Sequence, residues 1–413
     1  MKSLHIAFFN RAFSPEVSAT GQLLTELARG LVEDHGARVS VVTGIPLGVI
    51  HGSWSPPHGW CLIGQERWKG ISILRARGTS FSKRTLVGRM VNYLTYFGSA
   101  CWAGLKLKHP DVVIALTDPP IIGLAALMAA RRFRAKLVIS YRDLFPEAAR
   151  LLEVLRSPFI EKALRSINQI LIRHADALVA LGETMRRRLI EEKGAPASRV
   201  SVIPDWADCS AIRPVDKRNP FSLAHDLADC FVVMHAGNLG LSQNLDTLLA
   251  AADHLRDLPD LKVVLVGDGV RKASLQDQAK QRGLTQVQFL PYSPKEDLSN
   301  TFSAADCFII SLKPGLAGYI MPSKLYGILA AGRPYVAAVD DECDVARLTH
   351  EHQCGLVAKP GDPADLAEKI RLLYNDRSLL QRLGTNARDA ASAFDRPKGV
   401  KAYWDLCCSL TGG

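Results

Sequence analysis

The feature that most constrains this chain is a series of short runs of Val, Ile and Leu, each followed by a loop of small or turn-forming residues. The runs are continuous in apolar residues and do not alternate with polar ones. A strand of this kind is buried on both faces, as in a parallel sheet that helices cover on both sides. Because helical patterns separate the runs, the chain is predicted to be an α/β protein with doubly wound parallel sheets.

The strand-like runs fall into two sets, one in each half of the chain. They cover residues 4–9, 39–43, 112–116, 137–140 and 177–180 in the first half, and 231–235, 263–266, 287–290, 306–311, 335–339 and 355–357 in the second. A chain of 413 residues is also too long for one ordinary core. We expect two Rossmann-like domains that face each other across a cleft, at 1–205 and 223–385. A Pro- and charge-rich linker at 206–222 joins them, and a C-terminal helix within 386–413 crosses back to the first domain.

Residues 311–334 combine several features of an anion site. A predicted buried strand runs into a loop with two glycines, and the loop runs into a helix that Pro322 can open. Ser323 can satisfy a free amide of the first turn, and Lys324 adds a positive charge to the positive end of the helix dipole. Together these features favour a phosphate or diphosphate. For an isolated Pro-Ser-Lys, an ordinary capped helix with a solvated lysine is the alternative.

Other predicted strands of the second half also stop at Gly, Pro or Asn loops. The carboxyl ends of parallel strands line one crevice, where doubly wound sheets bind ligands. Tyr292 is a candidate for packing near a bound base, although core packing explains it equally well. The candidate binding residues of this crevice are Gly237, Asn238, Gly240, Asn244, Gly267, Gly269, Tyr292, Lys313, Gly315, Gly318, Pro322, Ser323 and Lys324.

Two loops of the first half occupy equivalent positions. Thr20 and Gly21 follow the first strand at a predicted helix start, although Gly21 can also be a simple turn residue. Arg142 and Asp143 follow a later strand, so they also lie at the ligand-facing rim. Asp143 is a candidate catalytic carboxylate, and a helix-capping role is the alternative.

The net charge of +10 is unevenly distributed. Residues 67–108 contain nine Lys or Arg residues and no Asp or Glu. Within this span, residues 86–107 mix apolar and aromatic residues with basic ends, as in an amphipathic helix that lies on anionic lipid. A solvated positive face over a core helix is the alternative. Nucleic acid is not expected as a partner, because the basic stretch contains no recognisable nucleic-acid module.

The remaining composition predicts where the protein works. Its nine cysteines form no C-x-x-C pair and no cluster at zinc spacing, so we expect reduced thiols in a cytoplasmic protein. We expect no signal peptide and no transmembrane helix, since no window of about 18 apolar residues occurs. The acidic run at 340–344 has the pattern of a solvated loop, and no metal or cofactor is predicted. The expected location is the inner face of the cell membrane, as a peripheral protein.

A family resemblance covers nearly the whole chain. It depends on Ser18-Ala19-Thr20-Gly21, Asp143-Leu144-Phe145-Pro146-Glu147, Val202-Ile203-Pro204-Asp205-Trp206, Gly237-Asn238-Leu239-Gly240, Val266-Gly267-Asp268-Gly269, Pro322-Ser323-Lys324 and Ala330-Ala331-Gly332-Arg333-Pro334. In this order, the stretches resemble the retaining glycosyltransferases of family 4, which have the GT-B fold. Within that family, the chain is most similar to bacterial enzymes of exopolysaccharide, colanic-acid and O-antigen assembly.

The resemblance implies a reaction and its partners. A nucleotide-sugar donor, UDP-linked more often than GDP-linked, gives a hexosyl or N-acetylhexosaminyl group to a polyprenyl-diphosphate-linked acceptor. The acceptor attacks from the front face, assisted by the leaving phosphate, without a metal or an obligatory protein nucleophile. The crevice residues of the second half then bind the donor, and Lys324 and Asp143 are the catalytic candidates. Thr20, Gly21 and Arg142 form the acceptor or diphosphate loop.

The chain departs from the family pattern at charged positions. Many members have a pair of glutamates where this chain has Tyr319 and Gly327, and an Arg and a Lys near Asn238 and Gln243. We therefore expect Lys324, the helix start at Ser323 and the glycine-loop amides to neutralise the diphosphate. Lys313 and Arg142 are further candidates.

Two other functions are compatible with this pattern. A nucleotide-sugar epimerase on the same fold needs carboxylates or histidines for acid/base work at the cleft. A membrane-bound scaffold or sensor of polysaccharide assembly is favoured by the missing glutamates.

Overall fold

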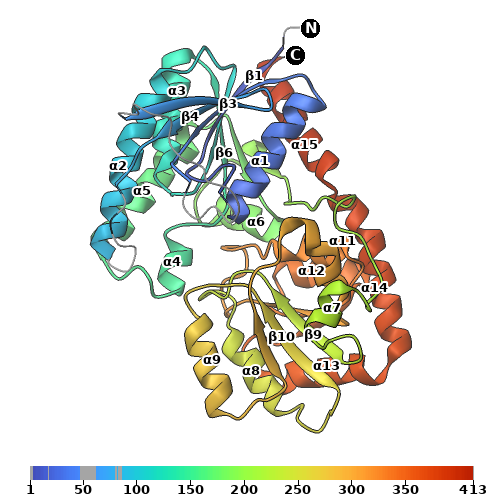
Figure 1. The fold of residues 1–413 in the computed structure, drawn as a ribbon. Helices are drawn as coiled ribbons and strands as arrows, with labels where there is room; N and C mark the ends of the chain where they lie inside the picture. Colours follow the sequence, from blue (N-terminus) through green and yellow to red (C-terminus); the bar gives the residue numbers. More distant parts are fainter. Residues whose placement is uncertain (1–2, 17, 47–61, 80, 82–85, 413) are drawn as a thin grey trace. The chain divides into compact units, whose positions relative to one another are not determined.

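The computed structural model describes residues 3–16, 18–46, 62–79, 81 and 86–412. The chain divides into two compact units, residues 1–204 with 397–413 and residues 205–396. Each unit contains a mainly parallel sheet covered by helices (Figure 1). The prediction of an α/β protein with parallel sheets is confirmed, because the central strands β1 and β5 of the first unit and β12 of the second are buried along their whole length.

The sheet of the first unit has eight strands in the order β3-β4-β2-β1-β5-β6-β7-β8. They are β1 (His5–Phe9), β2 (Arg38–Thr43), β3 (Ile63–Trp68), β4 (Ile71–Ala76), β5 (Val112–Leu116), β6 (Lys136–Ser140), β7 (Ala177–Ala180) and β8 (Val200–Val202). The edge strand β3 pairs antiparallel with β4, and the other described strand pairs of this sheet are parallel. The chain builds outward from β1 to one edge and then restarts beside β1 with β5. The loops after β1 and β5 therefore diverge at a topological switch point.

The sequence pattern missed three strands of this sheet, β3, β4 and β8. The edge strand β3 is only partly buried, so it lacks the continuous apolar run that marks a central strand. In β4, the buried residue Arg75 interrupts the apolar pattern, and it forms an ion pair of 2.5 Å with Glu66 of β3. The basic stretch therefore contributes less charge to the surface than its composition indicates.

The helices of the first unit are α1 (Ala19–Glu33), α2 (Leu86–Leu105), α3 (Ile122–Phe133), α4 (Glu147–Leu151), α5 (Pro158–His174), α6 (Glu183–Glu191) and α15 (Arg396–Thr411). The helix α2 has two different faces. Tyr96, Ala100 and Ala103 are buried, whereas Leu94 and Trp102 are more than half exposed. One side of α2 thus packs in the core, and the other side exposes apolar residues at the surface. The helix therefore has features of both sequence interpretations, the helix that covers the core and the amphipathic surface helix.

The C-terminal helix α15 packs against the first unit through close contacts. Val400 lies against Gly30 of α1, where an added Cβ would approach the Val400 side chain to 2.8 Å. The buried hydroxyls of Tyr403 and Ser140 lie 2.7 Å apart, which joins α15 to β6. His35 and Trp404 stack with ring centroids 4.9 Å apart.

The second unit has an all-parallel sheet in the order β11-β10-β9-β12-β13-β14. Its strands are β9 (Phe231–Ala236), β10 (Leu261–Val266), β11 (Val287–Leu290), β12 (Cys307–Ser311), β13 (Tyr335–Ala338) and β14 (Gly355–Ala358). Its helices are α7 (Pro220–Ala224), α8 (Leu245–Asp253), α9 (Lys272–Gln281), α10 (Leu298–Ser303), α11 (Lys324–Ala330), α12 (Asp344–His352), α13 (Pro363–Asn375) and α14 (Arg377–Ala391). Residues 206–222 lie within this unit, where Ala207 forms a β-bridge with Asp395.

We predict that the Tyr403–Ser140 hydrogen bond stabilises the docking of α15. In Tyr403→Phe, the buried Ser140 hydroxyl loses this partner, which should cost about 1–2 kcal/mol of unfolding free energy. Urea denaturation measures the change. In the double variant, Tyr403→Phe with Ser140→Ala, both hydroxyls are absent and neither is left without a partner. Its loss of unfolding free energy should therefore be smaller than the sum of the losses in the two single variants. Additive losses would contradict the bond.

Candidate functional site

The topology of the second unit places a candidate ligand site after β9 and β12. From β9 the chain builds outward through β10 to β11, and it then restarts on the other side of β9 with β12. The loops that follow β9 and β12 leave the sheet at this switch point, where doubly wound sheets bind ligands. These loops contain the Gly237–Gly240 segment and the stretch that leads to Lys324.

Three predicted glycines meet where the loops after β9 and β10 touch. The Gly237 amide donates to the Val266 carbonyl at 2.9 Å. Gly267 has a φ of +142°, and an added Cβ would lie 2.0 Å from the Gly237 oxygen. At Gly269, with a φ of +158°, it would lie 2.4 Å from the Leu239 oxygen. Only glycine allows these backbones to approach so closely.

The side chain of Lys324 reaches this glycine loop. Its Nζ lies 3.0 Å from Nε2 of His235 and 3.8 Å from where a Cβ of Gly237 would be. His235, at the carboxyl end of β9, is completely buried. Lys324 is partly exposed, but its amine is packed inward against these residues. The structure thus brings together Lys324 and Gly237, which the sequence placed in one predicted crevice.

The burial of this pair changes its electrostatics. Burial lowers the pKa of Lys324 to about 7. Burial, and then the charge of Lys324, hold the pKa of His235 well below its ordinary value, so the imidazole is neutral. Within the described residues, no carboxylate forms an ion pair with the Lys324 amine. The site therefore contains a lysine whose hydrogen-bond partner is neutral.

The start of α11 differs from the sequence prediction. The helix begins at Lys324, and Ser323 occupies the N-cap position with a helical backbone and no side-chain capping bond. Pro322 lies one residue earlier, so it does not open the helix. Both expectations are wrong, because the Ser323 backbone already has helical angles and its side chain makes no capping bond. With only seven residues, α11 is short, and Lys324 is the principal positive charge here.

The other predicted residues of the second unit lie in the same loops with defined partners. Gln243 accepts from the Gly240 amide at 3.0 Å, so its side chain occupies that amide. Tyr292 is half-exposed and donates to the Asp268 carbonyl at 3.3 Å. Asn244 is the N-cap residue of α8 and donates to Thr247. After β12, the Lys313 amide donates to the Ser242 carbonyl, the Gly315 amide donates to Asp340, and Gly318 has a φ of +74°. Asn238 lies beside Gly240 and Gly269.

The positions of the two family glutamates are also defined. An added Cβ at Gly327 would lie 2.9 Å from the ring of Phe302, so this position faces an apolar neighbour on α10. Tyr319 lies in the loop before α11, and its amide donates to the Leu316 carbonyl at 3.0 Å.

The first unit presents its candidates at the carboxyl ends of β1, β5 and β6. The Thr20 hydroxyl donates to the Asp118 carboxylate at 3.3 Å, across the switch point. Gly21 lies in the first turn of α1, where its amide donates to Ser18. The Arg142 amide donates to the Thr117 hydroxyl at 3.0 Å. Asp143 follows and is partly buried.

Sequence reasoning missed two polar residues at these strand ends. Asp118 lies two residues beyond the end of β5, after Thr117, and the loop pattern did not single it out. His235 interrupts the apolar run of β9 just before Gly237. A buried polar residue at the end of a central parallel strand points to a binding site.

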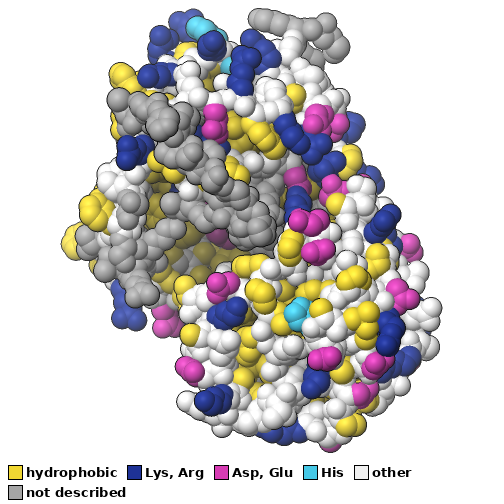
Figure 2. Space-filling model, viewed as in Figure 1, with side chains coloured by type: hydrophobic (Ala, Val, Ile, Leu, Met, Phe, Trp, Pro, Cys, Tyr) yellow, Lys and Arg dark blue, Asp and Glu magenta, His cyan; other side chains and the backbone are white. Residues whose placement is uncertain are grey.

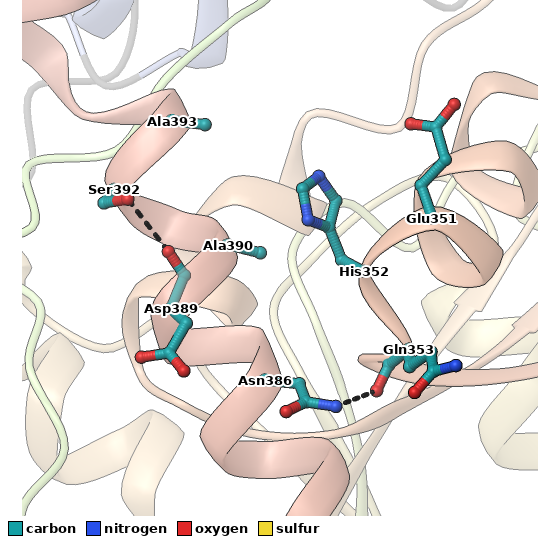
Figure 3. A pocket seen from close by; sticks show the side chains of 8 residues that line it. All are labelled: Glu351, His352, Gln353, Asn386, Asp389, Ala390, Ser392 and Ala393. Carbon is teal, nitrogen blue, oxygen red and sulfur yellow. Dashed lines mark hydrogen bonds between the residues drawn. The ribbon is translucent and has the colours of Figure 1, made fainter.

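A separate pocket of 390 Å³ lies in the second unit, between α12 and α14 (Figure 3). Its lining residues are Glu351, His352, Gln353, Asn386, Asp389, Ala390, Ser392 and Ala393. Asn386 donates to the Gln353 carbonyl and Ser392 to the Asp389 carbonyl, so these groups serve local backbone structure. None of the predicted site residues lines this pocket. Nowhere in the described ranges do three His, Cys, Asp or Glu side chains gather as a metal site would require.

Known proteins resemble both units. A family model described as "Glycosyl transferase 4-like domain" matches residues 19–206, and "Glycosyl transferases group 1" matches residues 219–390. The putative colanic acid biosynthesis glycosyl transferase WcaI of Escherichia coli is 24% identical over 354 residues, which are 84% of this chain and 86% of the relative. The probable glycosyltransferase WbjE of Pseudomonas aeruginosa is 26% identical over 64% of this chain and 66% of its own length.

Among solved structures, Alr3699/HepE of Anabaena, in complex with UDP and glucose, has a similar fold. The TM-score is 0.74 at 18% identity, and the match covers 98% of this chain and all of that one. At this identity the similarity establishes the fold, which is GT-B.

We predict that replacing Lys324 by methionine stabilises the ligand-free protein. Below pH 7 the folded state carries a buried ammonium, whereas the unfolded chain holds its proton up to about pH 10.5. The resulting cost to the unfolding free energy has its full value below pH 7 and disappears as the pH rises towards 10.5. Lys324→Met should therefore raise the unfolding free energy by about 1–3 kcal/mol at pH 6, and by less at pH 9. Denaturant titrations at both pH values measure this, and a destabilised variant at pH 6 would contradict it.

Proposed function

The chain belongs to the group 1, family-4-like glycosyltransferases with the GT-B fold, and from this premise we propose its substrates and the residues that act on them. It is a nucleotide-sugar glycosyltransferase of bacterial polysaccharide type. The proposed donor is a UDP-linked hexose or N-acetylhexosamine. The proposed acceptor is a saccharide on a polyprenyl diphosphate.

The observation that carries the proposed donor site is the Lys324 amine against the Gly237 loop at the switch point. The amine has no carboxylate partner among the described residues, so its charge is available to a ligand. The Gly267 and Gly269 turns bring backbone close to the same place. The amides of Gly237, Gly240, Gly267 and Gly269 already donate to acceptors within the protein, so the Lys324 amine is the group that suits a diphosphate, which carries charge on both phosphates.

The same charge serves the chemistry in our proposal. During transfer, the bond between the sugar anomeric carbon and the diphosphate oxygen breaks, and a bond to the acceptor hydroxyl forms on the same face. The hydroxyl proton passes to the departing phosphate oxygen. Lys324 stabilises the negative charge that develops on this leaving group, and such stabilisation is typically the largest single contribution to catalysis. No metal enters this scheme.

The first unit is proposed to hold the acceptor. Thr20, Gly21 and Arg142 lie at the carboxyl ends of its central strands, where a diphosphate or sugar hydroxyl can bind. Asp143, next along the same loop, is proposed to orient the attacking hydroxyl. The second unit is proposed to hold the donor, with Tyr292 beside the base and Lys313, Ser323 and Asn244 in the surrounding loops.

UDP is favoured as the donor nucleotide by likeness to known proteins. The Anabaena structure of the same fold was solved with UDP and with UDP-glucose. The relative WcaI is named for colanic acid biosynthesis, which supports a polysaccharide pathway.

We also propose that the first unit binds the anionic inner face of the cell membrane through the end of α2. Trp102 and Leu105 are exposed there, followed by the exposed Lys106 and Lys108. Arg131, Arg132 and Arg134 at the end of α3 are also exposed, and His109 packs edge-on against Phe133 to join these two helix ends. Lys and Arg side chains gather over part of this unit in Figure 2. Within the described ranges, no helix is long and apolar enough to cross a membrane.

We predict that Lys324 is required for nucleotide binding. In Lys324→Ala, loss of the charged contact should weaken binding of UDP, or of GDP if that is the donor nucleotide, by about 10- to 100-fold. Thermal-shift and calorimetric titrations measure this, because a bound ligand stabilises the folded protein. Lys280→Ala, which removes an exposed lysine at the end of α9, is the control and should bind as the wild type does. If neither nucleotide binds the wild type, the scaffold function is favoured instead.

We predict that the basic end of α2 contributes to membrane binding. Replacing both Lys106 and Lys108 by Gln should reduce binding to vesicles that contain anionic lipid by about 10- to 30-fold, since each lysine contributes about 1 kcal/mol. Sedimentation with phosphatidylglycerol vesicles measures the change. The charge-matched control is Lys280→Gln with Lys295→Gln in the second unit. Equal losses in the two pairs would indicate a general charge effect and contradict this surface.

A further inference from the structure

The Lys324 amine has an unusual partner for a buried cation. Buried lysines are normally paired with a carboxylate, because an unpaired buried charge is costly. Here the amine lies 3.0 Å from Nε2 of His235, and this imidazole is itself completely buried. A neutral imidazole can accept a hydrogen bond from the amine, but it supplies no negative charge to balance it.

Among the described residues, the surroundings supply no negative charge that balances the pair. In the part of the chain that the structure describes, Lys324 is the residue whose charge acts on the His235 ring, and the backbone carbonyls of Asn238 and Ile309 lie beside that ring. Lys272, the first residue of α9, donates at 3.0 Å to the carbonyl of Gly267, on the loop after β10. Asp268 lies on the same loop, and Tyr292 on the loop after β11 donates to the Asp268 carbonyl. Lys313 is the charged group on the loop after β12. Neither Asp268 nor Lys313 contributes to the pKa shifts of the pair.

We propose that His235 is a positioning residue that holds Lys324 beside the donor site as a neutral partner, so that binding of the donor diphosphate takes up one proton from solvent onto the lysine amine. This inference rests on the proposed donor site and adds a proton to its binding equilibrium.

The pH range of the coupling follows from the burial of the amine. In the free protein, burial lowers the pKa of Lys324 to about 7, so the amine is mostly neutral at pH 8. A bound diphosphate brings negative charge beside the amine and raises its pKa, which draws in a proton. Donor affinity should therefore be highest below pH 7. Above pH 7 it should fall by up to about tenfold per pH unit, until the pH reaches the pKa of the bound form.

Calorimetry of the wild-type protein tests this directly. UDP-glucose and GDP-mannose are titrated at pH 6 in MES and in Bis-Tris, and at pH 8 in HEPES and in Tris; the two buffers of each pair differ in ionisation enthalpy. The dependence of the binding heat on the buffer gives the number of protons taken up. These nucleotide sugars are suitable probes because their diphosphate diesters do not titrate in this range. We expect uptake of about 0.9 proton at pH 8 and about 0.1 at pH 6, from a free pKa of about 7.

Two substitutions separate the role of His235 from a purely structural one. His235→Gln keeps a neutral acceptor, so proton uptake at pH 8 should remain. His235→Glu supplies a permanent counter-charge that keeps Lys324 protonated, so uptake at pH 8 should fall towards zero and the diphosphate should bind more weakly. His350→Gln, at an exposed position in the last turn of α12, is the control and should match the wild type.

The outcomes distinguish this inference from the proposed function. If a nucleotide sugar binds the wild type and Lys324→Ala loses it, but no proton is taken up at pH 8, the coupling is wrong and the donor site stands. Unchanged uptake in a folded His235→Glu variant overturns the role of His235. If neither nucleotide sugar binds, the proposed donor site fails and the coupling fails with it. The wild-type titrations decide the coupling even if a variant does not fold.

Discussion

The parallel hydrogen-bond ladder between β9, β10 and β12 is the constraint on which the candidate site depends. It aligns the carboxyl ends of these strands, so the loops that follow them leave from one edge. The loops after β9 and β10 then join through backbone hydrogen bonds, from Gly237 to Val266 and from Leu239 to Asp268. Glycines at 267 and 269 permit this contact, because a side chain at either position would collide with a carbonyl. The Lys324 amine lies against this joined backbone, 3.8 Å from where a Cβ of Gly237 would be.

The electrostatics of the site differ from the pattern of the family that it resembles. By the sequence resemblance, Tyr319 and Gly327 stand where many members are expected to have glutamates and Gln243 stands near an expected cation; the Gln243 side chain accepts from the Gly240 amide. Positive charge is thus concentrated on Lys324, whose amine is packed against a neutral histidine. Such an amine lowers stability in the free protein, and in our proposal a bound diphosphate supplies its compensating charge. This conflict between stability and binding is typical of functional sites.

In the first unit, the number of basic residues in the sequence overstates the positive charge at the surface, because one of these residues is buried. The basic span at 67–108 contains Arg75, which points inward and pairs with Glu66 of the adjacent strand. The surface charge near α2 is provided instead by Lys106 and Lys108 and by the arginines at the end of α3. These residues are distant in sequence and are brought together because α2 packs against α3.

The sequence by itself determined the α/β class, the central strands and the loops that contain the candidate residues, because continuous apolar runs and glycine turns are local signals. It did not reveal β3, β4 or β8, whose patterns depend on neighbours in the sheet. It also misjudged the start of α11, where the backbone of Ser323 is already helical. Only the tertiary structure decided that Lys324 meets His235, residues that are 89 positions apart. Burial and mutual contact depend on the packing of the whole sheet, so no local pattern contains them.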